Sequence, residues 1–174
     1  MATIVTRSGK GAPLSLTEID DNFSNLNDDK AEVDNPTFTG YITGKLKFLA
    51  EKLEIVAAGG TGTLNIDLDD STAWYYTSNN SANWTFNIRG NGSTTLNSML
   101  DVGDSITIAV LMTNGASAYY PTAHQVDGSA VTVKWQGGTA PTLGNSNAID
   151  VYTYTIIKTA NATFTVIGSQ TKYS

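Results

Sequence analysis

Two carboxylates in the run NIDLDD have a spacing that could serve acid–base chemistry or metal binding. Asp67 and Asp69 lie two residues apart, which on a strand would put both on one face, roughly 7 Å apart. Such a pair could bind calcium or hydrolyse a glycosidic bond. However, the spacing of an EF-hand loop is absent, and an acidic strand edge followed by a turn explains the same residues. We therefore expect no catalytic residue here.

The only histidine, His124, lies in the run SAYYPTAHQVDG. A Ser–His–Asp triad is a spatial arrangement that the sequence does not exclude, but no serine has Gly-x-Ser-x-Gly surroundings. We expect His124 to be a loop or interface residue. Tyr119 and Tyr120 precede it and could stack on a sugar. These three residues are the predicted surface ligand contacts.

Composition excludes several classes of function. The 174 residues include no cysteine, so disulfides and thiolate metal sites are impossible, and we expect no metal or other cofactor. The net charge of −6 and the lack of a Lys/Arg cluster argue against a nucleic-acid partner. No segment is apolar for long enough to insert in a membrane, and the N-terminus lacks the apolar segment of a signal peptide. We therefore expect assembly in a cytoplasm.

The elements that would position these side chains begin with a helix. Ser15 and Glu18 form a Ser-x-x-Glu capping box, and Pro36 ends the helical pattern. Apolar residues then recur at coiled-coil intervals: Leu16, Ile19, Phe23, Leu26 and Val33. Lys30 occupies one core position of this pattern, and the flanking positions are polar.

This narrow apolar seam needs a partner, because an isolated helix of about 20 residues is marginal in water. The seam could lie across the β-structure of the same chain or meet copies of itself. Its narrowness favours copies, since docking on a broad sheet needs a wider apolar face. The helix alone does not choose between two and three copies.

The rest of the chain predicts β-structure. Residues 36–60 indicate a short extended neck that ends at a glycine-rich hinge. From residue 61 charged residues are scarce, and seven or eight short runs alternate apolar with polar residues, for example Leu64–Leu68 and Ile106–Met112. Ile149–Lys158 and Thr163–Gly168 would form a hairpin. We expect a mainly β fold with an N-terminal α-helix, in which a short coiled coil precedes an antiparallel β-sandwich or jelly-roll-like domain over residues 61–174.

Three segments of the sequence resemble tailed-bacteriophage proteins. In Met1–Ala31, a short lead and Gly-Lys-Gly-x-Pro-Leu at residues 9–14 precede Glu-Ile-Asp-x-Asn-Phe-x-Asn-Leu-Asn at residues 18–27. This arrangement resembles the N-terminal region of many phage fibre and other virion structural proteins, in which the lead is extended. The phrase NPTFTG at Asn35–Gly40 is also fibre-like. Val126–Thr159 is similar to terminal β-domains of fibre-like proteins in phages of cyanobacteria and marine bacteria.

The resemblance implies a non-enzymatic structural protein of the virion, assembled in the host cytoplasm. Its residues 1–35 would attach to other virion proteins, through a lead at residues 1–13, and would form a homotrimer through a trimeric coiled coil. The β-domain would face outward, where it could contact host surface glycans. The expected function is therefore a short tail fibre or a baseplate or collar appendage. A capsid decoration protein is the alternative, because NPTFTG occurs once and no repeated shaft follows. A polysaccharide depolymerase is a third hypothesis.

Overall fold

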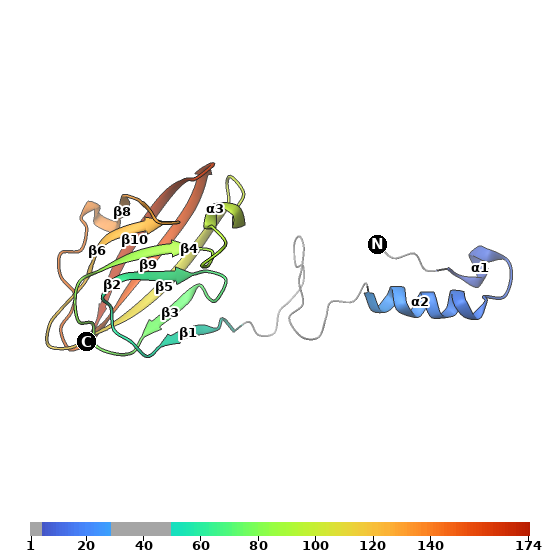
Figure 1. Cartoon of the computed structure of the whole chain (residues 1–174), viewed down its shortest axis with the longest axis horizontal. Coiled ribbons are helices and arrows are strands. Elements are labelled where there is room, and N and C mark those ends of the chain that lie inside the picture. The colour runs from blue at the N-terminus through green and yellow to red at the C-terminus, as the bar shows by residue number, and fades with distance from the viewer. Residues whose placement is uncertain (1–4, 29–49) are drawn as a thin grey trace. The chain divides into compact units, whose positions relative to one another are not determined.

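The computed structural model describes residues 5–28 and 50–174 of the chain (Figure 1). The chain divides into two compact units, residues 1–49 and residues 50–174, which we describe separately. Residues 36–49 of the predicted neck lie outside the described residues. Residues 50–60 belong to the second unit and include a sheet strand at Leu53–Val56, so the β-structure begins before the predicted residue 61. Within the described ranges, no helix is long and apolar enough to cross a membrane.

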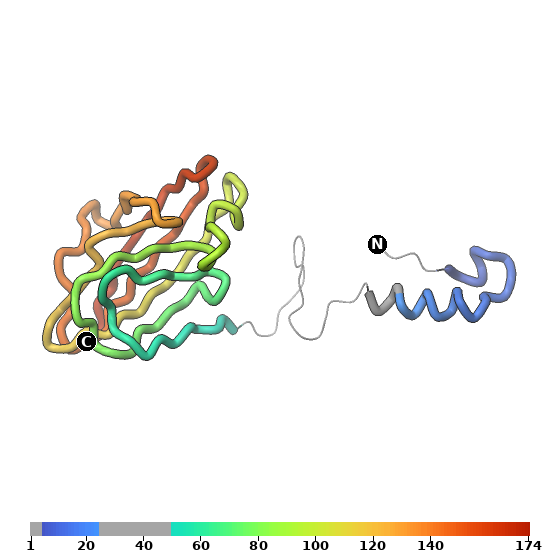
Figure 2. Tube along the Cα trace, in the orientation of Figure 1, coloured from blue at the N-terminus to red at the C-terminus, as the bar shows by residue number. Residues whose placement is uncertain are grey.

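The described part of the N-terminal unit consists of two helices, α1 (Arg7–Lys10) and α2 (Leu16–Asp28) (Figure 2). The extended lead implied by the resemblance is wrong for residues 7–10, because the Thr6 side chain accepts a hydrogen bond from the Gly9 amide and starts one helical turn. Gly11 ends that turn with a φ of 71°, a left-handed conformation that glycine adopts without strain.

The predicted start of helix α2 is confirmed. The Ser15 hydroxyl accepts a hydrogen bond from the Glu18 amide at 3.2 Å, and the Glu18 carboxylate accepts one from the Ser15 amide at 2.7 Å. These reciprocal bonds are the capping box read from the sequence, and they satisfy amides that no helical carbonyl reaches. The predicted helix end at Pro36 lies outside the described residues.

The second unit contains two β-sheets. One has six strands in the order β1 (Leu53–Val56), β3 (Ala73–Tyr76), β5 (Ser105–Asn114), β9 (Ala148–Ala160), β10 (Thr163–Tyr173) and β8 (Val133–Trp135). The other has four, in the order β2 (Gly62–Asp67), β4 (Trp84–Arg89), β6 (Pro121–Val126) and β7 (Ser129–Ala130). A one-turn helix, α3 (Leu96–Met99), connects β4 to β5, and a 3₁₀ turn (Gln136–Gly138) follows β8. A mainly β fold is thus confirmed.

The prediction of an antiparallel arrangement is wrong for most of the strand pairs. From β1 to β6 successive strands alternate between the two sheets, so each strand pairs with the strand two places before it in the chain. The two strands of such a pair run in the same direction. The pairs β1–β3, β3–β5, β2–β4 and β4–β6 are consequently parallel, as is β8–β10. Antiparallel pairing is found for β5–β9, β6–β7 and the predicted β9–β10 hairpin.

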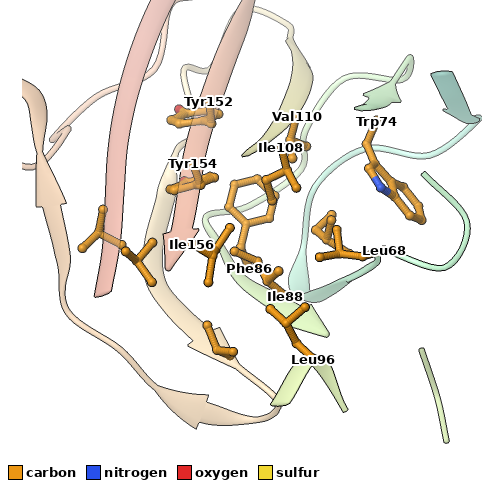
Figure 3. Packing of buried hydrophobic residues seen from close by; sticks show 14 of the residues in the cluster. Leu68, Trp74, Phe86, Ile88, Leu96, Ile108, Val110, Tyr152, Tyr154 and Ile156 are labelled. Atoms are coloured by element: carbon orange, nitrogen blue, oxygen red, sulfur yellow. The ribbon is translucent and has the colours of Figure 1, made fainter. Parts of the chain in front are cut away.

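The hydrophobic core lies between the two sheets (Figure 3). Phe86 of the four-stranded sheet packs edge-on against Tyr152 and Tyr154 of the six-stranded sheet, with ring centroids 6.0 and 5.8 Å apart. The end of the core near α3 is closed by Leu96, which is completely buried. Alternation along each strand sends one set of side chains into this core and the other set outward.

Candidate functional site

The predicted apolar seam is exposed on α2 as far as the structure describes its side chains. Leu16, Ile19 and Phe23 are 81%, 36% and 69% exposed. Leu26 lies within α2, but its side chain is outside the described set, as is the whole of Val33. Three apolar side chains at one edge of a well-capped helix thus lack cover within the described part of the N-terminal unit.

The segment before α2 is fastened to one flank of that helix. The Val5 amide donates a hydrogen bond to the Asn22 side-chain oxygen, and the Asn22 side-chain nitrogen donates one to the Val5 carbonyl, both at 2.8 Å. Lys10 donates a hydrogen bond to the Glu18 carboxylate. This bond, together with that from the Ser15 backbone, lowers the pKa of Glu18 to about 2. On a helix, positions 18 and 22 lie beside the seam, so the lead leaves the seam open.

The predicted ligand contacts Tyr119 and Tyr120 lie in the loop between β5 and β6 and are half-buried. Their amides donate to the side-chain oxygens of Asn114 and Asn83, at 3.2 and 3.1 Å. The loop is thereby fixed to the end of β5 and to the start of β4. Tyr119 also packs against the core, which leaves Tyr120 as the freer of the two aromatic rings.

A buried polar chain supports this loop. Asn80 donates to Asn114 at 2.9 Å, and Asn114 donates to Asp150 at 3.0 Å. The Asn145 amide also donates to Asp150, at 2.8 Å. Burial nevertheless raises the pKa of Asp150 above its usual value. These residues join three loops at one end of the β-unit, and the sequence pattern gave no sign of them.

His124 lies in strand β6, so the expectation of a loop position is wrong, while that of an interface position stays a prediction. It is paired in register with Phe86, and this places its ring on the inner side of the four-stranded sheet. Its Nε2 lies 2.8 Å from the Tyr154 hydroxyl, and its ring contacts that of Trp135 edge-on with centroids 5.4 Å apart. Burial lowers the pKa of His124 to about 4. The ring is therefore neutral at pH 7 and is held within an aromatic cluster.

The structure places Asp67 and Asp69 in different elements. Strand β2 ends at Asp67, so Asp69 lies in the following turn and the predicted common strand face is wrong. Asp67 forms a two-point ion pair with Arg89, with Nε–Oδ1 and Nη2–Oδ2 distances of 2.5 and 3.1 Å. Asp69 accepts a hydrogen bond from Asn91. Among the described residues, no cluster of three His, Cys, Asp or Glu side chains could hold a metal ion.

Beside the edge strand β8, the outer side of the six-stranded sheet is hollowed by a groove of about 440 Å³. Its lining is mostly apolar and uncharged, with Lys134 at one side, and includes Thr153, Thr155, Ile167 and Ser169. The groove is open and shallow, and it offers few groups that could orient a small polar ligand.

Comparison with known proteins gives no match: no protein-family model, no curated protein and no solved structure is similar to this chain.

Proposed function

We propose that this protein is a structural subunit of a tailed-phage virion, joined into a homotrimer through the seam on α2. In this proposal the N-terminal unit attaches to other virion proteins. The β-unit is displayed on a short fibre or a baseplate or collar appendage, where it contacts the host surface. The proposal includes no catalytic step and no cofactor.

The exposure of Leu16 and Phe23 on α2 is the observation that supports this proposal best. Burying one such side chain completely contributes about 1.5–3 kcal/mol. A trimeric coiled coil would bury the seam of each copy against two others, and so gain this contribution three times per position. The spacing of the seam favours a coiled coil, and the resemblance to phage fibre proteins supports three copies and a place on the virion.

The contacts of the lead fit a role in attachment. Residues 5–11 are held on the flank of α2 by Asn22 and Glu18, and this arrangement does not use the seam. A trimer can therefore form with the lead in place, so that each copy presents the same folded lead to another virion protein. Asp67 has a structural role, because Arg89 binds both of its carboxylate oxygens. This contact makes the depolymerase hypothesis the weaker one.

The seam can be tested by measuring the mass of the full chain in solution. We expect the wild-type chain to have three times its monomer mass of 18.4 kDa. Phe23→Asp puts a charge into each seam, and should raise the concentration needed for assembly at least tenfold. Ser24→Asp is the matched control, because it adds the same charge to an exposed position on another side of α2, and should leave the mass unchanged. A wild-type chain that stays monomeric, or equal effects of the two variants, would overturn the proposal.

A further inference from the structure

The outer faces of the two sheets differ in character. On the four-stranded sheet most outward residues are polar, and several are bonded to one another. Asn87 donates to Asn65 at 2.8 Å, and Arg89 forms its ion pair with Asp67. Such a face is well suited to contact with water.

The six-stranded sheet presents an outer face that is mostly apolar, with Ser and Thr between the apolar residues. Ile55, Tyr75, Leu111 and Val151 are direct partners across β1, β3, β5 and β9, so that their side chains form one continuous row. The next row consists of Leu53 and four smaller residues, Ala73, Ala109, Thr153 and Ser169. Two further rows contain Thr, Ser and Ile. They are Thr107, Thr155 and Ile167, and then Ser105, Ile157 and Thr165. We call all these residues together the apolar sheet face.

Charge is nearly absent from this surface. On the described strands of this sheet, Lys134 on the edge strand β8 is the only charged residue at an outward position. The chain as a whole has a net charge of −6. Two copies that approached each other through acidic surfaces would repel each other. The apolar sheet face brings no carboxylates together.

The size of the face approaches what a stable contact needs. Each outward residue covers about 32 Å² of the flat sheet, two residue rises of roughly 3.3 Å by a strand spacing of roughly 4.8 Å, so the residues of the face cover about 480 Å². Side chains add to this flat area, and a standard protein interface buries about 800 Å² on each partner. Ile55 and Ile167, at opposite sides of the face, are 56% and 45% exposed in the single chain.

We infer that the apolar sheet face is the surface through which the β-units of sister copies pack against one another. The number of copies rests on the proposed function: in a trimer the three faces would surround the symmetry axis as three walls, each in contact with the other two. The small residues Ala73, Ala109 and Thr153 would allow close approach near the centre. The polar faces of the four-stranded sheets would then point outward.

The test uses the full chain and two double variants. Ile55→Lys with Ile167→Lys puts two charges on the apolar sheet face at exposed positions. Thr63→Lys with Ala123→Lys is the matched control, since both positions are exposed and lie in one row on the outer side of the four-stranded sheet. Each pair of substitutions is introduced into the wild-type chain and into the Phe23→Asp variant. The mass of every protein is measured over a range of concentrations, and unfolding curves verify that it is folded.

We expect Phe23→Asp to retain weak, concentration-dependent association through the apolar sheet face. Adding Ile55→Lys and Ile167→Lys should remove it and leave a monomer, whereas the control pair should not. In the wild-type chain the first pair should weaken assembly at least tenfold more than the control pair. If the two pairs have equal effects, the inference is wrong, while sensitivity to Phe23→Asp would still support the helical seam. If only the sheet variants act, the seam is wrong and the sheet interface stands.

Discussion

His124 illustrates how one titratable ring is accommodated inside the β-unit. Its hydrogen bond to Tyr154 satisfies one ring nitrogen, and the rings of Phe86 and Trp135 surround it. The neutral form fits this environment, and burial therefore lowers the pKa of His124 to about 4. In the unfolded chain the pKa is about 6.5. A single residue thus links the stability of the β-unit to pH.

The expected effect is a loss of stability in mild acid. Below pH 6.5 the unfolded chain binds a proton at His124 that the folded chain does not, so the free energy of unfolding falls as the pH decreases towards 4. Between pH 7 and pH 4.5 the loss is about 2 kcal/mol, since one pKa unit corresponds to about 1.4 kcal/mol. Urea unfolding at both pH values measures it.

His124→Gln is the variant that isolates this effect, because glutamine can still bond Tyr154 but does not titrate. Its loss of stability between the two pH values should be smaller than that of the wild type by about 2 kcal/mol. The raised pKa of Asp150 acts in the opposite direction, since the folded chain then binds a proton more readily than the unfolded one. That contribution is common to both proteins and cancels in the comparison. Identical losses in the two proteins would refute the assignment.

At the scale of elements, the β9–β10 hairpin contains a strained position. Ala162, in the turn, has a φ of 49°, a left-handed conformation that costs a residue with a Cβ about 1–2 kcal/mol. We expect Ala162→Gly to raise the free energy of unfolding by about 1 kcal/mol, measured by urea denaturation. Ala160→Gly, at the end of β9 and without a positive φ, should instead lower it by about 0.5–1 kcal/mol. Stabilisation by both variants, or by neither, would contradict this account.

The strands themselves could be predicted from sequence, because alternation with a period of two is a local signal. Leu64–Leu68, Ile106–Met112 and Ile149–Lys158 all coincide with strands, within a residue or two at their ends. The direction of pairing could not be predicted, since alternation does not indicate that successive strands enter different sheets. Helices α1 and α3 cannot be predicted from periodicity, because one turn held by the side chain of Thr6 or Thr95 is too short to have a period.

The candidate sites were predictable to different degrees. The capping box and the seam depend on spacing within one helix, and Leu16, Ile19 and Phe23 are indeed exposed there. The surroundings of His124 depend on its register with Phe86, which only the folded sheet defines. The sequence also carries a signal for the apolar sheet face. In Val151–Ile157 the residues on both faces of the strand are uncharged, whereas a strand with one face in water usually carries charged or strongly polar residues there.

At the scale of the whole molecule, contact with the host separates a fibre from a capsid decoration protein. We expect purified trimer to bind host cells, and Tyr120→Ala to weaken that binding about tenfold without changing the mass, because aromatic rings contribute strongly at binding surfaces. Val102→Ala, at another exposed position, is the control and should have no effect. If the wild-type trimer shows no binding to cells, the protein is better explained as a decoration of the capsid.

The alternation of strands between the two sheets also affects biosynthesis. Strands β1 to β6 emerge from the ribosome before β9, yet β9 supplies Tyr152, Tyr154 and Ile156, which fill the middle of the core. Until those residues have been synthesised, the inner sides of the earlier strands face water and are open to wrong partners. Rapid closure of the local β9–β10 hairpin against β5 would then extend the six-stranded sheet and cover the core in one late step, so the emerging chain is exposed to misfolding for most of its translation.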